Sequence, residues 1–137
     1  MILSGKYEHT LDDRGRVAIP ALYRHLFTEG VMLAEGPEGC VLVYTKQDFE
    51  LAAQEYMREP VTSKRVRDLQ RSFFPSAWPA GLDHQGRVLV PAALRQWAEL
   101  NGAVVVCGRG VCLEIWNPQR WQEAKARSAR VAAGEAE

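Results

Sequence analysis

The chain has 137 residues, of which 47% are hydrophobic and 25% are charged, and its 17 lysines and arginines balance 17 aspartates and glutamates. This composition is typical of a globular protein and argues against a mainly disordered, collagen-like or membrane chain. Taken alone, the zero net charge also argues against a nucleic-acid partner, because domains that bind nucleic acid usually carry a basic excess.

The N-terminal segment turns polar within its first eight residues, too early for a signal peptide. No segment of the sequence approaches the roughly 18 uninterrupted apolar residues of a membrane span. A cytoplasmic protein without a membrane partner is therefore expected.

The first predicted elements are strands at residues 6–11 and 16–19, joined by a turn at residues 12–15. Successive side chains of a strand point to opposite faces, so Val17 and Ile19 are expected to point inward. Pro20 suits the first turn of a short helix, where its missing N–H costs nothing.

Two further strands are predicted at residues 31–35 and 40–44, around a glycine- and proline-rich turn. A closing helix then begins at Thr45, where the sequence resembles a capping box, and ends before Pro60. Residues 60–75 form a linker helix that ends at Pro75.

The same order of elements then recurs. Residues 11–26 and 82–97 share eight identities in sixteen positions at an offset of 71. The identical pairs are Leu11 and Leu82, Asp12 and Asp83, Gly15 and Gly86, Arg16 and Arg87, Val17 and Val88, Pro20 and Pro91, Ala21 and Ala92, and Arg24 and Arg95.

This repeat predicts an α+β fold of two tandem ββαββα units, at residues 5–59 and 76–127. In the second unit a helix runs from Ala92 to Leu100 and stops at Asn101–Gly102. One unit of this size cannot bury its sheet alone, so the two units are expected to pack together. The remaining residues, 128–137, are expected to be a disordered tail.

The sequence gives no sign of a metal site or a cofactor. Cys40, Cys107 and Cys112 are widely spaced and lie in apolar runs, which indicates small buried side chains rather than ligands. The three histidines lack the spacing that would place two imidazoles on one face.

The recurring loop, D-x-x-G-R followed by V-x-[IV]-P, is the candidate functional site. Its aspartates, Asp12 and Asp83, are expected to shape the loop through an Asx turn or an ion pair with the arginine four residues on, and Gly15 and Gly86 to provide its turn. An arginine held in this way presents a rigid donor fork that suits phosphate or guanine.

On that reasoning the candidate DNA-binding residues are those of the loop and of the strand before it, namely Lys6, Arg14, Arg16 and Arg87. A hydrolase that uses Asp12, Asp13 and His84 is an alternative. It is disfavoured because the second copy does not repeat the carboxylate pair and neither loop contains a serine or cysteine nucleophile.

These residues carry a family resemblance. The opening segment GKYEHTLDDRGR at residues 5–16, the repeat LDHQGRV at residues 82–88 and the closing LEIW at residues 113–116 resemble the MraZ family, bacterial proteins with two SpoVT/AbrB-type units. The resemblance covers about residues 1–125.

The resemblance implies a swapped-hairpin β-barrel formed within one chain, with flanking helices, and a homo-oligomeric ring of subunits. It also implies a nucleoid-associated transcriptional regulator, usually a repressor of its own division and cell-wall gene cluster, that binds short repeated elements in double-stranded promoter DNA. The family's DNA-contacting loop corresponds to Asp12, Arg14 and Arg16.

The second loop is less basic, because Gln85 replaces Arg14 and Ala77 replaces Lys6. The first copy is therefore expected to dominate DNA contact, with Arg87 partly structural or interfacial. One small loop neutralises few phosphates, so a ring that presents it several times would be needed for firm binding.

The balanced charge hides an asymmetry. Residues 1–60 carry 6 basic and 10 acidic side chains, whereas residues 61–137 carry 11 and 7. Opposite charges on the two halves suit subunits that pack the first unit of one chain near the second unit of the next. The basic cluster in the linker, made of Lys64, Arg65, Arg67 and Arg71, is interpreted as a solvated helix face rather than a DNA contact. The other reading of the whole chain is a ring-forming protein-interaction module that does not bind DNA.

Overall fold

The computed structural model describes residues 1–58 and 60–135. The first unit forms, in order, β1 (Lys6–Thr10), β2 (Arg16–Ala18), the 3-10 helix η1 (Ala21–Phe27), β3 (Val31–Glu35), β4 (Val41–Thr45) and α1 (Lys46–Arg58). The segment between the units forms α2 (Lys64–Phe73) and the short 3-10 helix η2 (Phe74–Ser76). The second unit forms β5 (Trp78–Ala80), β6 (Arg87–Leu89), α3 (Ala92–Ala98), β7 (Ala103–Gly108), β8 (Leu113–Trp116) and α4 (Pro118–Ala132).

This order confirms the mixed α+β class, and each half of the chain has the order strand, strand, helix, strand, strand, helix. The strands form a six-stranded antiparallel sheet, in the order β1-β7-β8-β4-β3-β5, and a separate two-stranded sheet of β2 and β6. The two units exchange strands, because β1 pairs with β7, β5 pairs with β3, and β2 pairs with β6. Neither unit therefore completes its own sheet.

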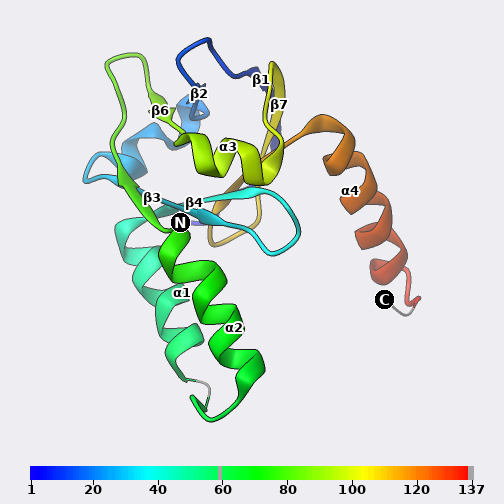
Figure 1. Ribbon diagram of the computed structural model, residues 1–137. Helices are drawn as coiled ribbons and strands as arrows, with labels where there is room; N and C mark the ends of the chain where they lie inside the picture. Colours follow the sequence, from blue (N-terminus) through cyan, green and yellow to red (C-terminus); the bar gives the residue numbers. More distant parts are fainter. Residues whose placement is uncertain (59, 136–137) are drawn as a thin grey trace.

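The six-stranded sheet is the middle layer of three and is covered on both faces. One face packs against the β2–β6 pair, η1 and α3, through a core that includes Val17, Ile19, Val88 and Val90. The other face packs against α1, α2 and α4 through a second core, rich in aromatic side chains, that includes Tyr44, Phe73, Trp116 and Trp121. Figure 1 shows α1 and α2 as a helical hairpin that projects from this layer.

Local sequence signals explain most element boundaries. The hydroxyl of Thr45 accepts from the N–H of Asp48 at 3.1 Å, which confirms its predicted capping role at the start of α1. Ser63 and Asn117 cap α2 and α4 in the same way. Val17, Ile19, Val88 and Val90 are fully buried, as strand alternation predicts.

Three predictions need correction. The helix at residues 21–27 is 3-10 rather than α. α3 ends at Ala98, earlier than predicted. Glu99 adopts a left-handed conformation (φ 53°) and caps the C-terminus of the helix before Asn101–Gly102 is reached. The prediction of a disordered tail is wrong for residues 128–132, which continue α4 to Ala132 behind its Asn117 cap. Residues 136–137 of that predicted tail, and residue 59 at the predicted end of the first unit, lie outside the described residues.

Candidate nucleic-acid interface

Each copy of the recurring loop is held by its aspartate. One carboxylate oxygen of Asp12 accepts from the backbone N–H groups of Arg14 (2.9 Å) and Arg16 (2.8 Å). Asp83 accepts in the same way from Gln85 (2.9 Å) and Arg87 (2.9 Å). Both aspartates thus form the predicted Asx-type turns, and the two loops have the same geometry.

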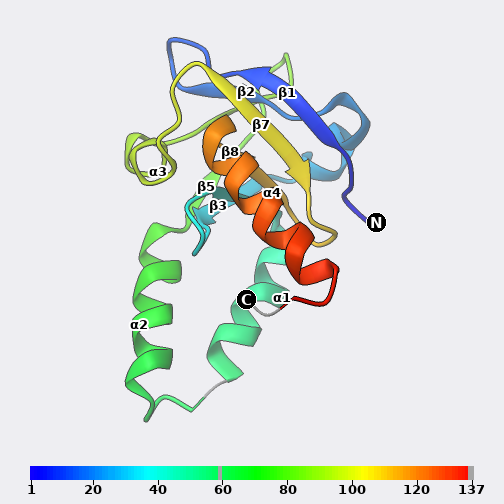
Figure 2. The same cartoon turned by 90° about the vertical axis from the view of Figure 1, so that its right-hand side faces the viewer.

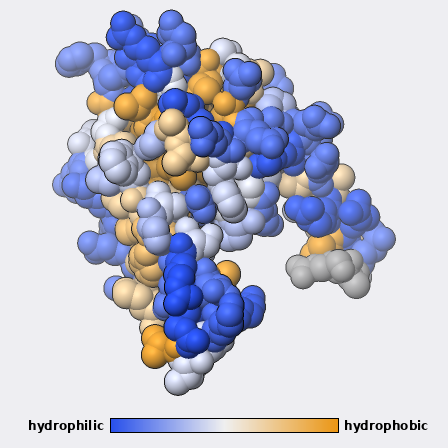
Figure 3. Space-filling model, viewed as in Figure 1, coloured by the Kyte–Doolittle hydropathy of each residue, from blue (hydrophilic) through white to orange (hydrophobic). Residues whose placement is uncertain are grey.

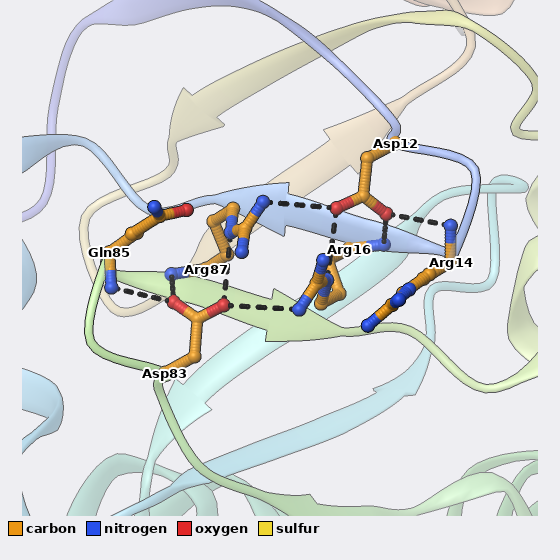
Figure 4. Close-up of polar contacts among 6 residues, drawn as sticks. All are labelled: Asp12, Arg14, Arg16, Asp83, Gln85 and Arg87. Atoms are coloured by element: carbon orange, nitrogen blue, oxygen red, sulfur yellow. Dashed lines mark hydrogen bonds and ion pairs between the residues drawn. The ribbon is translucent and has the colours of Figure 1, made fainter.

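The second oxygen of each aspartate binds arginine side chains from both units, as Figure 4 shows. Within each loop the Nε of the arginine lies 2.9 Å from the carboxylate, in Arg16–Asp12 and in Arg87–Asp83. Across the loops, Arg87 Nη1 lies 3.3 Å from Asp12 and Arg16 Nη1 lies 3.6 Å from Asp83. The four side chains form one ion-pair network in the outer face of the β2–β6 pair.

This network sets the charge state of the two carboxylates. The backbone N–H of Arg16, followed by the Arg16 side chain, lowers the pKa of Asp12, even though partial desolvation opposes the shift. The backbone N–H groups of Arg87 and Gln85 and the Arg87 side chain lower the pKa of Asp83 in the same way. Both aspartates are therefore ionised at neutral pH, and the two arginines have fixed counter-charges.

The loop glycines satisfy two separate requirements. Gly15 (φ 79°) and Gly86 (φ 74°) both adopt left-handed backbone conformations that favour glycine. Each also lies beneath an arginine of the other unit, Arg95 over Gly15 and Arg24 over Gly86. Those two arginines bind the backbone carbonyl groups of Val90 and Ile19, respectively. The arginines thus connect the helix region of one unit to the loop of the other.

The predicted site residues are not all brought together. Arg14 lies exposed in the first loop, while Arg16 and Arg87 are about one-quarter exposed within the network. Lys6 is exposed too, but it begins β1, four residues before the end of that strand. At about 3.3 Å per residue, it lies roughly 13 Å along the strand from Thr10, the last strand residue before the loop. The structure therefore groups Arg14 with the arginine network and sets Lys6 apart from it.

The residues of the hydrolase alternative do not form a site. Asp12 is engaged by Arg14, Arg16 and Arg87, while Asp13 and His84 are exposed in two different loops. Within residues 1–58 and 60–135, no group of three or more histidine, cysteine, aspartate or glutamate side chains could hold a metal ion. Among those residues, too, none of the helices has both the length and the apolar character needed to cross a bilayer.

The chain matches one protein-family model over nearly its whole length. A family model described as "MraZ protein, putative antitoxin-like" matches the chain twice, at residues 2–72 and 73–137. The chain belongs to the MraZ family. The two matches begin 71 residues apart, which is the offset of the internal repeat, and they meet within the segment between the two predicted units.

Curated MraZ relatives agree over most of their length. The chain is 42% identical to "Transcriptional regulator MraZ" of Roseiflexus castenholzii over 118 residues, which is 86% of this chain and 82% of the relative. It is 41% identical to the protein of the same name from Thermobifida fusca over 133 residues, or 97% and 93% of the two chains. The protein of that name from Deinococcus radiodurans is 38% identical over 122 residues, or 89% and 86%. The MraZ family is thus one of transcriptional regulators and not an enzyme class.

A second polar cluster in this MraZ chain was missed by the sequence reasoning. Glu114 lies in β8 with its side chain 8% exposed, and it accepts from Arg109 Nε at 2.8 Å and from the indole N–H of Trp116 at 2.9 Å. Alternation along β8 predicts an outward glutamate, but both faces of the sheet are covered here. Arg109 also donates to the thiol of Cys112 at 3.3 Å.

The three cysteines are buried and free, as their apolar surroundings predict. Burial is the main cause that raises the pKa of Cys40, and it raises the pKa of Cys107 to about 12 and of Cys112 to about 11. Thiols with such values are protonated at neutral pH and are poor nucleophiles or ligands.

Proposed function

We propose that this chain is a sequence-specific, DNA-binding transcriptional regulator whose β2–β6 pair enters the major groove. The observation that carries the proposal is the arginine network on the outer face of that two-stranded ribbon. The major groove of B-DNA is wide enough for a two-stranded antiparallel ribbon, and arginine is the side chain that most often reads guanine there. Membership of a family of transcriptional regulators supports the same function.

The geometry of Arg16 suits such a contact. Its Nε is bound to Asp12 and its Nη1 faces Asp83, so the guanidinium cannot rotate freely. The remaining nitrogen, Nη2, has no partner among the described residues and is available to a base or a phosphate. Because the side chain is already ordered, less conformational entropy is lost on binding. Arg87 has the matching position in the second loop, and exposed Arg14 adds a phosphate contact.

We assign the DNA-facing surface to the loop end of the molecule. Figure 3 shows hydrophilic side chains gathered over this end, where the β1–β2 and β5–β6 loops lie in Figure 1. The aspartates neutralise much of the charge of the network, so a single chain offers few free cations. Binding by one chain would be weak and sensitive to salt.

A homo-oligomeric ring would solve this problem by presenting several ribbons to repeated DNA elements. One surface that supports association of subunits contains four exposed apolar side chains. They are Met1 (75% exposed), Ile2 (77%), Leu51 (55%) and Val111 (57%). Backbone hydrogen bonds between Leu3 and Gly110 place the N-terminal residues beside Val111, and Leu51 lines one hollow of the surface together with Val111. Exposed apolar patches of this kind are typical of protein interfaces.

α4 supports the same assembly. It packs through Trp121 and Ala124, while Lys125 to Ala132 are exposed. Figure 1 shows α4 at one side of the molecule with its C-terminal half clear of the body, and Figure 2 shows it face on, in front of the strands. This outer half carries Lys125, Arg127 and Arg130, and it belongs to the unit with the positive net charge. A half-exposed basic helix suits contact with the more acidic first unit of a neighbouring chain.

We further propose that the exchanged strands close as the swapped-hairpin barrel of SpoVT/AbrB-type proteins. The DNA target would be short repeated elements in the promoter of the protein's own division and cell-wall gene cluster, with repression as the outcome and association with the nucleoid as the result. These assignments rest on the family resemblance together with the exchange of β1 and β5 between the units.

A gel-shift titration with the DNA immediately upstream of the gene tests the proposal. The wild-type chain should bind upstream duplexes with short direct repeats and not a shuffled duplex of equal length. Arg16→Ala should abolish the shift while the oligomer, measured by light scattering, persists. Retained binding by Arg16→Ala at moderate salt would remove the ribbon from the mechanism.

The competing function is a ring-forming module that binds another protein. The observation in its favour is the neutralised arginine network, which leaves few free charges for DNA. Assembly of the wild-type chain without affinity for any upstream duplex would favour this alternative.

A further inference from the structure

The outer face of the β2–β6 ribbon carries one large apolar side chain that neither core uses. Leu89 is 51% exposed, whereas Val88 and Val90 on either side of it are fully buried. In the strand register, Leu89 lies opposite Arg16, and Ala18 lies opposite Arg87. The ribbon thus places a leucine beside one arginine and an alanine beside the other.

The two ends of the ribbon are therefore chemically unequal. The Arg16 end has Arg14 in its loop and Leu89 as its cross-strand neighbour, whereas the Arg87 end has Gln85 and Ala18. Figure 4 shows Arg14 next to Arg16, and Gln85 next to Arg87. Because Leu89 comes from the second unit, the more cationic end is a composite of both units.

We infer that Leu89 is a specificity-determining residue whose side chain packs against the 5-methyl group of a thymine, beside the base contacted by Arg16. This inference rests on the proposed DNA-binding function. Bases present an apolar group to the major groove as the thymine methyl, and aliphatic side chains contact it there. An exposed leucine next to an ordered arginine matches a thymine next to a guanine.

The Arg87 end lacks this recognition. Ala18 occupies the position equivalent to Leu89 at the offset of 71 residues, and its single methyl group cannot extend as far from the ribbon. The ribbon therefore reads a DNA element whose sequence is asymmetric, with the thymine at one end only. This asymmetry arises although the backbone of the ribbon is nearly symmetric. Such an asymmetric element suits repeats that all run in the same direction.

Single replacement of thymine by uracil tests this inference directly, because uracil keeps every hydrogen bond and removes only the methyl group. The probe is an upstream duplex that the wild-type chain binds, with each thymine replaced in turn. One replacement should weaken wild-type binding about fourfold, the effect of one lost buried methyl group. Leu89→Ala should bind the parent duplex about as weakly as the wild type binds the uracil-substituted duplex. The same uracil replacement should not weaken the binding of Leu89→Ala further.

Matched variants separate this contact from general effects. Met57→Ala removes another apolar side chain of similar exposure (58%) from α1, and it should keep the full uracil effect. Leu89→Met keeps an apolar contact and should also keep it. An unchanged melting temperature of Leu89→Ala shows that the fold is intact. If Leu89→Ala does not fold, Leu89→Ser provides a second truncation of the same side chain.

Two results would overturn the inference while leaving DNA binding in place. One is a wild-type chain that binds the duplex but is indifferent to uracil at every position. The other is a folded Leu89→Ala variant that retains the uracil penalty. A wild-type chain that binds no upstream duplex would instead refute the proposed function, and the role of Leu89 with it.

Discussion

The guanidinium of Arg95 occupies the space into which a side chain on Gly15 would project. Gly15 belongs to the first unit and Arg95 to the second, and Arg24 and Gly86 repeat the relationship in the opposite direction. The two arginines thus pack over the two recurring loops without being part of the ion-pair network.

This packing predicts the cost of adding a methyl group to the loop. Gly102 has a similar backbone conformation (φ 76°) but no atom within 4 Å of the added carbon. Gly102→Ala should therefore lower the free energy of unfolding by about 1–2 kcal/mol through the backbone alone. Gly15→Ala should cost about 1 kcal/mol more, because Arg95 must release the carbonyl of Val90. Urea unfolding measures both values.

An Arg95→Ala background provides the control for this pair. Without the guanidinium, Gly15→Ala and Gly102→Ala should lower the free energy of unfolding by the same amount. A persistent difference between them would show that Arg95 does not crowd Gly15.

Arg14 should contribute to DNA binding but not to stability. Its side chain is exposed in the loop, so Arg14→Ala should leave the melting temperature unchanged. Loss of one phosphate contact should weaken binding and reduce the slope of log K against log salt by about 1. Fluorescence anisotropy over a salt series measures this slope. Arg65→Ala, on the exposed face of α2, is the matched control and should change neither quantity.

The aspartates of the network should make stability depend on pH. The folded state lowers the pKa values of Asp12 and Asp83 below their ordinary value of 3.8, so the unfolded chain binds more protons near that pH. Their contribution is complete well above 3.8 and is lost as the pH falls through the lower folded-state values. The double variant Asp12→Asn/Asp83→Asn should keep the turns and lose less stability than the wild type between about pH 6 and about pH 3. Denaturant midpoints at several pH values measure the difference.

Asp13→Asn is the control for this pH dependence, since Asp13 is exposed in the same loop. Its acid profile should follow that of the wild type. If the double variant also follows the wild type, the network does not set the acid stability of the fold.

Glu114 should be essential to the second core. Glu114→Ala leaves the buried indole N–H of Trp116 without its acceptor and removes the carboxylate that pairs with Arg109, so it should lower the free energy of unfolding by about 3 kcal/mol. Glu123→Ala, on the exposed side of α4, should change it by less than about 0.5 kcal/mol. Thermal and urea unfolding measure both variants, and equal effects would contradict the assigned role of Glu114.

The three thiols should be inert in the folded chain. Burial keeps Cys40, Cys107 and Cys112 protonated at neutral pH, so Ellman's reagent should label none of them quickly. All three should react once urea unfolds the chain. A thiol that reacts rapidly in the native state would contradict the burial described for these residues.

Strand alternation in the sequence predicted which side chains enter the core, as Val17 and Val88 illustrate. It could not predict which strands pair, because the inward face of β1 is the same whether its neighbour is β2 or β7. The exchange of strands depends on contacts between residues about one hundred positions apart, such as Lys6 and Cys107.

The candidate site shows the same division. The repeat identified Asp12, Arg16, Asp83 and Arg87 as candidate site residues and predicted either a turn or an ion pair within each loop, and both are formed. Alternation and spacing could not show that the two loops share one network. Arg24 and Arg95 carried a usable signal, since both copies keep an arginine there. Glu114 carried none, because an acidic residue between Leu113 and Ile115 is typical of a half-exposed strand.

The exchange of strands has a consequence for synthesis on the ribosome. β1 and β2 emerge first, yet their partners β7 and β6 lie in the second unit. The nascent first half must therefore wait, with its strand edges unpaired, until residues 87–108 have left the exit tunnel. Translation must pass beyond β7 before the loop that carries Arg14 and Arg16 can take its final form.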